Sequence, residues 1–428
     1  MERQLSENRF VFTDLHLGER KNNNLDYFSA DEEFFNCIML IIKEYVLSET
    51  PMELILLGDT FDFLTVSYDW TETNKKGQKI KKSRILAEPT EEASMQKIKK
   101  IFNAHPKVID ALKLFLNYGK IKFFIGNHDV SLAWGRVQLL IKEMLTEKLT
   151  QAGKQDASNR ISFSFEEKKS KVLFEHGNNC EPHCAMPKKI FLTRRLGQPL
   201  QKPILNHPYG NHLLELANRL ASDTFWCKGN YWIGRLEPHW YIYLSFYKNW
   251  WFTIYATITW LFFPFRHRFS KRWWVRKEHS LFKLFSFSLQ AMLTTVLNKI
   301  RGQDSTDYFR ELLKHNRDID IVVSGHLHEH HQETTRYGTY INPGGWCEIN
   351  RASFPRPKLT WRRFRFIEKI SKYIWTVRKV FHKKTSNQFL PKKSEIYGFV
   401  ICKFYKDGHK EVGLMRYNNQ KKCLEILN

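Results

Sequence analysis

The chain has 428 residues and a formal net charge of +24, and 15% of its residues are aromatic. This length exceeds one compact domain, so we expect a core domain with additions. The excess of positive charge predicts an anionic partner, which is a phosphorylated substrate, nucleic acid or an acidic membrane surface. Because aromatic residues serve both nucleic-acid stacking and membrane interfaces, composition does not separate the last two.

The cysteines and the N-terminus bear on the compartment. Seven cysteines are scattered along the chain, and only Cys180 and Cys184 lie close together. This pattern argues against a disulfide framework and against a zinc site built from two cysteine pairs. Residues 1–12 contain no apolar run typical of a signal peptide. We therefore expect a cytoplasmic protein with reduced thiols.

The first predicted strand ends at two metal-type side chains. Residues 10–16 read FVFTDLH, an apolar run followed by Asp14 and His16. Because these residues are two positions apart in an extended chain, they face the same side. A helix is predicted over residues 32–47, where apolar residues recur at helical spacing.

The next strand, within residues 54–63 (LILLGDTFDF), is a short apolar run that stops at a glycine and an aspartate. Such runs are typical of strands buried on both faces. Gly58 permits a sharp turn, after which Asp59 is either a turn-forming residue or a metal ligand. The polar, lysine-rich residues 71–82 predict an exposed loop.

Three further strands end in the same way. A helix over 91–116, interrupted at Pro106, leads into residues 121–129 (IKFFIGNHD), and the strands at 171–177 (KVLFEHG) and 319–328 (IDIVVSGHLH) follow. The alternation of strands and helices predicts a layered α/β fold. Any one fragment could be an ordinary turn or a structural histidine, but the series predicts one metal site at the strand ends. The side chains at these three ends are Asn127, His128, Asp129, His176, His326 and His328.

The order of these motifs, D-x-H, G-D-x-x-D, G-N-H-D, H-G and G-H-x-H, resembles that of the calcineurin-like metallophosphoesterases, from about residue 10 to residue 348. The resemblance implies a four-layer sandwich, in which two packed β-sheets are flanked by helices. The expected core comprises residues 1–235, 300–352 and 395–428. A terminal hairpin is predicted over 396–414, with its turn at 406–408.

The resemblance also implies roles for the site residues. Asp59 would bridge two divalent metal ions, which the mixed donor set suggests are Mn²⁺, with Fe²⁺ or Zn²⁺ as alternatives. One ion would be completed by Asp14, His16 and His328, and the other by Asn127, His176 and His326. His128 would donate a proton to the leaving oxygen, and Asp129 would orient His128. Asp62 would not bind a metal itself but would hold one of the metal ligands in position.

Two aromatic and basic insertions are predicted, at 236–299 and 353–394. Residues 250–265 are uncharged and are followed by RHRFSKRWWVRK. This pattern favours an interfacial membrane anchor over a cap with buried aromatics. Residues 362–384 have the spacing of a basic amphipathic helix, which fits either a membrane surface or a helix docked on the enzyme.

The loop after His176 leaves its role open, since Glu181, His183 and Lys188 could contact substrate or decorate the surface. The resemblance is strongest to the branch that holds the UDP-2,3-diacylglucosamine pyrophosphohydrolases of lipid A synthesis. It implies metal-assisted attack of water on a phosphodiester or pyrophosphate, on a lipid-linked substrate at the inner face of a membrane. Two alternatives stand beside it: a nuclease or nucleotide phosphodiesterase whose basic surface binds nucleic acid, and a non-catalytic metal-site scaffold.

Overall fold

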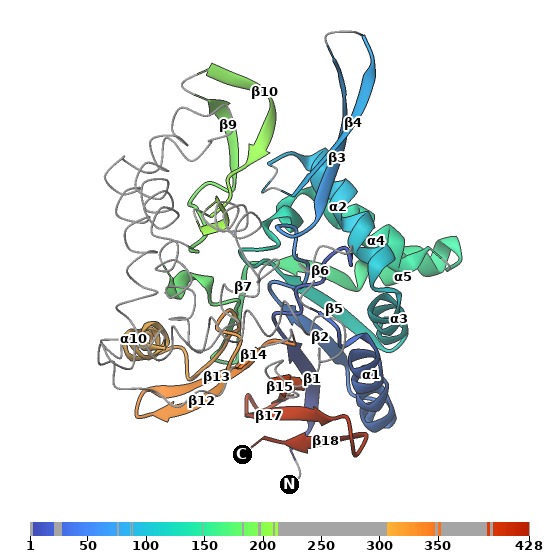
Figure 1. Ribbon diagram of the computed structural model, residues 1–428. Coiled ribbons are helices and arrows are strands. Elements are labelled where there is room, and N and C mark those ends of the chain that lie inside the picture. Colours follow the sequence, from blue (N-terminus) through green and yellow to red (C-terminus); the bar gives the residue numbers. More distant parts are fainter. Residues whose placement is uncertain are drawn as a thin grey trace, which may run out of the picture.

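The computed structural model has a mixed α/β fold, which confirms the predicted fold class (Figure 1). The predicted insertion at 236–299 and the predicted basic helix at 362–384 lie outside the residues that it describes. None of the helices within the described residues is long and apolar enough to cross a membrane. The described residues are 3–20, 28–74, 77–85, 87, 89–147, 149–181, 184–195, 198–208, 210–212, 306–346, 350–351, 392–393 and 397–427.

The larger sheet has seven strands in the order β18-β17-β16-β1-β2-β5-β6. Strands β1, β2, β5 and β6 run parallel, so their carboxyl ends lie at one edge. Strands β16 and β17 form the predicted hairpin, in which Gly408 adopts a φ of 84° at the turn. The strands are β1 (Leu5–Phe12), β2 (Met52–Leu57), β5 (Gly119–Phe124), β6 (Ile161–Ser164), β16 (Tyr397–Tyr405), β17 (Lys410–Asn418) and β18 (Cys423–Ile426).

The smaller sheet has five strands in the order β12-β13-β11-β8-β7. Its central strands β8, β11 and β13 are parallel, so the residues that follow β8 and β11 also share an edge. The strands are β7 (Glu166–Lys169), β8 (Val172–Glu175), β11 (Ile321–Val323), β12 (His330–Thr335) and β13 (Gly338–Pro343).

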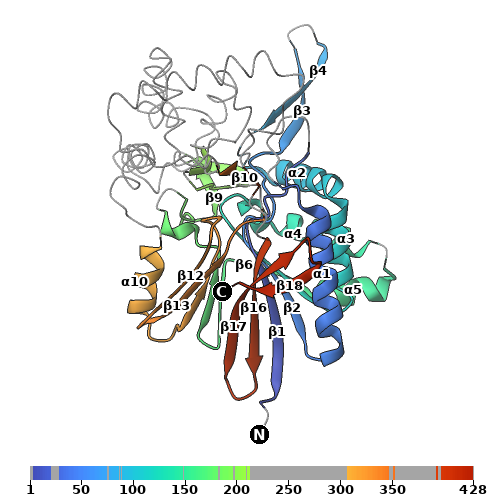
Figure 2. The same ribbon diagram turned by 60° about the horizontal axis from the view of Figure 1, so that its bottom comes forward.

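Apolar residues of the two sheets meet in one buried cluster, which includes Val11 and Phe124 of the larger sheet and Phe174 and Val323 of the smaller. On the other face of the larger sheet, a second cluster joins its strands to α1, α2, α3 and α4, and a third joins the smaller sheet to α10. Figure 2 shows α1 and α3 beside the larger sheet and α10 beside the smaller. The helices are α1 (Asp31–Tyr45), α2 (Glu91–Ala104), α3 (Pro106–Phe115), α4 (Gly135–Thr146), α5 (Gln151–Asn159) and α10 (Asp307–His315).

Two local predictions have different outcomes. The break at Pro106 is confirmed, because this proline occupies the first turn of α3, where its missing N–H costs nothing. The exposed loop predicted over 71–82 is wrong, because β3 (Ser67–Thr73) and β4 (Lys79–Ile85) form a hairpin there. The rings of Tyr68 and Trp70 stack with centroids 5.8 Å apart, and Gly77 turns the chain at a φ of 77°.

The remaining elements are short. A two-stranded sheet follows the loop after His176, and another joins a residue pair just before the second predicted insertion to a pair near the C-terminal end of that insertion. The elements are β9 (Phe191–Arg195), β10 (Gln198–Leu205), β14 (Asn350–Arg351), β15 (Lys392–Lys393) and the single-turn helices η1 (Val46–Ser48), η2 (Val130–Ala133) and η3 (Asn178–Cys180).

Candidate metal centre

The predicted ligand-bearing segments follow five parallel strands, and backbone hydrogen bonds tie their tips together. After β1 and β2, Asp14 N donates to Gly58 O at 3.2 Å and His16 N donates to Asp59 O at 2.9 Å. After β8 and β11, Gly325 N donates to His176 O at 2.9 Å. Each of these bonds ties strand ends within one sheet, and His326 N, which donates to Asp14 Oδ2 at 2.9 Å, joins the two sheets where the structure gathers the predicted site residues.

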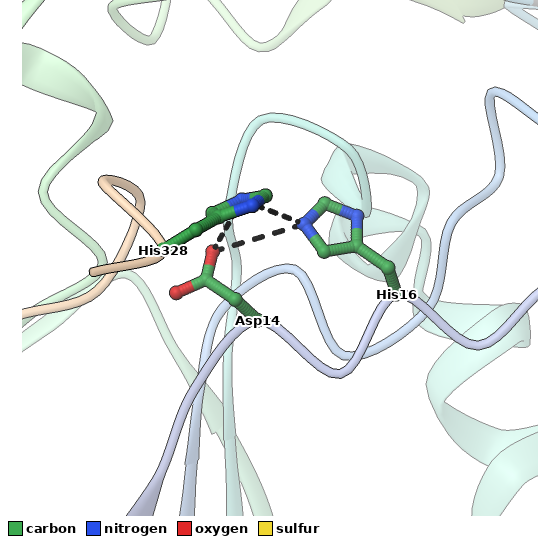
Figure 3. A group of neighbouring side chains, drawn as sticks. All are labelled: Asp14, His16 and His328. Atoms are coloured by element: carbon green, nitrogen blue, oxygen red, sulfur yellow. Dashed lines mark hydrogen bonds and ion pairs between the residues drawn. The ribbon is translucent and has the colours of Figure 1, made fainter. Parts of the chain in front are cut away.

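The first group of potential ligands is Asp14, His16 and His328 (Figure 3). Asp14 Oδ2 accepts hydrogen bonds from Thr13 Oγ1 at 2.7 Å and His326 N at 2.9 Å. Within the described part of the chain, the buried Asp14 Oδ1 has no hydrogen-bond partner, and it lies 3.4 Å from His328 Nε2. The Nε2 atoms of His16 and His328 are only 3.1 Å apart. Two ring nitrogens and a carboxylate oxygen that converge in this way fit a divalent cation.

The second group is Asp59, His176 and His326. His176 Nδ1 donates to Leu57 O at 3.0 Å, so in the neutral ring the lone pair that could bind a metal is on Nε2. His176 Nε2 is buried and lies 3.2 Å from Asp59 Oδ2. The same Asp59 oxygen lies 3.8 Å from His16 Nε2. Asp59 therefore stands between the two groups, where a bridging carboxylate would be needed.

Asn127 lies in the loop that covers Asp59. The N–H of its neighbour His128 donates to Asp59 Oδ1 at 2.8 Å. The side-chain oxygen of Asn127 is buried and has no hydrogen-bond partner among the residues that the structure describes. The burial of a carbonyl oxygen without a partner is costly, and a cation would supply the missing interaction. Asn127 thus fits the role of an oxygen ligand.

The backbone is strained at the ligands themselves. Asp14, His16, Asp59, His326 and His328 adopt φ values of 52°, 50°, 49°, 69° and 58°. Residues other than glycine rarely enter this left-handed region, at a cost of about 1–3 kcal/mol each. Backbone strain at residues whose side chains converge on one place is typical of a functional site.

Two glycines are required by close approach. A Cβ added to Gly126 would lie 2.2 Å from Asp59 Oδ1, and one added to Gly325 would lie 1.8 Å from Thr13 Oγ1 and 2.4 Å from Asp14 Oδ2. Since these distances are far below van der Waals contact, any larger residue would push the carboxylates away from the site. This explains why glycine precedes the ligands in the G-N and G-H motifs.

The electrostatics of the site favour added positive charge. Burial alone would raise the pKa of Asp14 and Asp59, but the neighbouring histidines outweigh it and hold both pKa values well below their usual range. Burial would lower the pKa of His176, but Asp59 raises it to about 9. The carboxylates of Asp14 and Asp59 are therefore charged, and the raised pKa values of His16 and His176 favour protons on these two rings that balance them in the metal-free protein. A divalent cation would supply the same compensation.

His128 is oriented by a different residue from the one that the sequence suggested. The expected partner was Asp129, but His128 Nδ1 lies 3.0 Å from Asp62 Oδ1. The other oxygen of Asp62 lies 3.5 Å from His16 Nδ1, so Asp62 supports both histidines. Asp129 instead accepts backbone N–H bonds from Gly126 at 2.6 Å and Thr60 at 2.9 Å.

Asp129 therefore ties the loop after β5 to the loop after β2. Its burial, followed by the nearby charge of Asp59, raises its pKa to about 7. The expectation failed because adjacent residues in a turn project in different directions. Asp129 turns inward beneath the loop, while His128 remains at the surface of the site with 17% of its side chain exposed.

The sequence missed one residue near the site and left the roles of three others open. Asn211 Nδ2 donates to Asn127 O at 2.6 Å. The two residues are 84 positions apart in the sequence, and no local pattern predicts this contact. Of the loop residues left open, Glu181 lies 3.4 Å from His326 Nε2 and Lys188 is exposed. His183 lies outside the described residues.

Comparisons with known proteins give only weak support. No family model and no curated protein matches the chain. Among solved structures, a dimetal phosphatase from Danio rerio is similar with 11% sequence identity and a TM-score of 0.28, over 80% of this chain and 88% of that chain. An overlap at that TM-score does not define a shared fold, so the function is inferred from the site geometry.

Metal binding is predicted to strengthen as pH rises. Because the pKa of His176 is raised to about 9 in the metal-free protein, this ring is protonated below that pH, and a bound cation must displace the proton. As the pH is lowered from 8.5 to 7, the affinity for Co²⁺ should fall by about tenfold per pH unit for each proton that the ion must displace. Isothermal titration calorimetry in buffers of different ionisation enthalpy measures both quantities. A pH-independent affinity without proton release would contradict this electrostatic account.

Proposed function

We propose that this chain is a metal-dependent phosphoester hydrolase with a two-metal centre. The observation that carries the proposal is the position of Asp59 between two groups of potential ligands, with His128 next to both. When bound, two divalent cations about 3.5–4 Å apart neutralise phosphate oxygens and acidify an attacking water. Histidine donors alongside carboxylates favour Mn²⁺, Fe²⁺ or Zn²⁺ over Mg²⁺. The two sheets with helices on their outer faces support the four-layer sandwich of the calcineurin-like family.

Different residues of the chain would bind the cations and donate the proton. Asp14, His16 and His328 would hold one cation, and Asn127, His176 and His326 would hold the other. His128 lies within the same cluster, since it joins His16 and Asp59 in a third group of converging ligand atoms. Because Asp62 fixes its Nδ1, the Nε2 edge of His128 is left to donate a proton to the leaving oxygen. An oxygen that departs as an alcohol needs this proton, because an alkoxide is a poor leaving group.

We further propose that the substrate is lipid-linked and is met at a membrane surface. The support is the sequence of residues 250–277, in which an uncharged aromatic run is followed by clustered arginines, lysines and tryptophans, and the basic helical pattern of 362–384. Aromatic rings at the level of the headgroups and cations on acidic phosphates would hold the enzyme next to its substrate. A nucleotide joined to an acylated sugar, as in the family branch named above, combines both halves of such a substrate.

Replacement of His128 tests the proton-donor role. His128→Ala should keep its metals yet lose about 10²–10⁴-fold in kcat on a phosphodiester with a poor leaving group. The loss should shrink on a nitrophenyl phosphodiester, because that leaving group departs without a proton. His315→Ala, which removes an exposed histidine from α10, is the matched control and should change neither rate. Equal losses of His128→Ala on both substrates would argue against proton donation.

Membrane contact is tested by sedimentation with vesicles. Each cation near an acidic leaflet contributes about 1 kcal/mol, and this contribution falls with salt. The wild type should co-sediment with phosphatidylglycerol vesicles at low salt and partly detach at high salt. Replacing Arg266, Arg268, Lys271 and Arg272 with serine should release it and leave cleavage of a soluble phosphodiester intact.

The matched control removes the same number of positive charges from exposed sites elsewhere and should still bind the vesicles. It replaces with serine Lys120, Lys406, Lys421 and Lys422. Wild-type protein that stays in the supernatant with acidic and neutral vesicles alike would contradict the membrane proposal. If the protein instead binds DNA tightly and in a salt-dependent way, the result would favour the nuclease alternative.

A further inference from the structure

A further cluster of metal-type side chains lies next to the second ligand group. Glu181 and Cys184 come from the loop that follows β8 and His176, and they face His326, which follows β11. His326 Nε2 lies 3.4 Å from Glu181 Oε2. One ligand atom each of Glu181, Cys184 and His326 falls within 4.8 Å of the other two. Neither Glu181 nor Cys184 has a role in the proposed hydrolysis.

The loop is held in this shape by its own hydrogen bonds. Cys184 N and Ala185 N both donate to Glu181 O, at 2.9 Å and 3.0 Å, and form a tight turn. From inside the protein, the buried Asn178 donates its Nδ2 to Cys184 O at 2.8 Å. Ligands separated by two residues on such a turn can bind the same ion, as in the cysteine pairs of structural zinc sites. The turn therefore presents the carboxylate and the thiol on one side before any ion arrives.

We propose that Glu181, Cys184 and His326 form an auxiliary metal site for a thiophilic divalent ion such as Zn²⁺, adjoining the proposed two-metal centre. One sulfur, one oxygen and one nitrogen ligand, with water as the fourth, make the tetrahedral set that Zn²⁺ accepts. The sulfur ligand discriminates against Mn²⁺ and Mg²⁺, which prefer oxygen. Binding releases the thiol proton to solvent, so no oxidant or reductant is involved.

Because His326 belongs to both groups, the two sites compete. His326 is the shared ligand, so an ion held by Glu181 and Cys184 would compete for its imidazole with the cation near Asp59 and His176. Excess Zn²⁺ would then lower turnover, even though Zn²⁺ is also an ion that the main centre could bind. This consequence rests on the proposed phosphoesterase activity, whereas the auxiliary site itself does not.

The site is tested by titrating the metal-free full-length protein with Co²⁺. Cobalt bound to a thiolate gives a sulfur-to-metal charge-transfer band in the near ultraviolet, which nitrogen and oxygen ligands do not give. The wild type should show this band, and Cys184→Ser should lack it. Glu181→Gln should keep the band but weaken Co²⁺ binding by at least about tenfold. Cys180→Ser is the matched control, because Cys180 lies in the same loop but outside the cluster, and it should retain the full band.

The outcomes separate this site from the proposed function. A band that persists in Cys184→Ser, or one that Cys180→Ser removes, would overturn the assignment, and so would a wild type without the band. In parallel, inhibition by excess Zn²⁺ should be weaker in Cys184→Ser than in Cys180→Ser if the two sites compete for His326. If the protein hydrolyses no phosphoester, the cobalt band still decides whether the auxiliary site exists.

Discussion

The buried carboxylate of Asp59 is the feature on which the site depends. It lies 3.2 Å from His176 Nε2, 3.8 Å from His16 Nε2 and 2.8 Å from the N–H of His128. A charged carboxylate removed from water costs several kcal/mol unless opposite charge is close. Asp14 and Asp62 are equally buried, so three negative charges must be balanced in one small volume. Imidazolium rings achieve this in the metal-free protein, and two divalent cations would achieve it with ligands already in place.

The fold brings the ends of the strands together at the site. Parallel strands in each sheet end at a common edge, and the apolar cluster between the sheets holds those edges together. Glycine at positions 126 and 325 then allows backbone and carboxylate to approach within distances that a Cβ would forbid. The left-handed conformations of the ligand residues are the local cost of this arrangement, and the packing of the strands sustains it. Packing and chemistry are therefore coupled through the turns at the strand ends.

Much of this arrangement could be read from the sequence because it is local. The apolar runs predict the strands, and the residue that follows each run predicts what meets at the sheet edge. The partner of His128 could not be predicted, since the contact with Asp62 spans 66 positions and depends on how two turns are directed. The hairpin over β3 and β4 was hidden because both of its faces are largely polar and exposed, which removes the alternation that marks a strand. The contact of Glu181 with His326 likewise arises only when two distant loops meet.

The central claim is that Asp59 joins two metal ions. The most direct measurement is a crystal structure of the protein grown with Mn²⁺, with anomalous diffraction recorded near the manganese edge. The account predicts one anomalous peak contacted by Asp14, His16 and His328, a second contacted by Asn127, His176 and His326, and Asp59 in contact with both. A single peak, or two peaks of which only one touches Asp59, would contradict it.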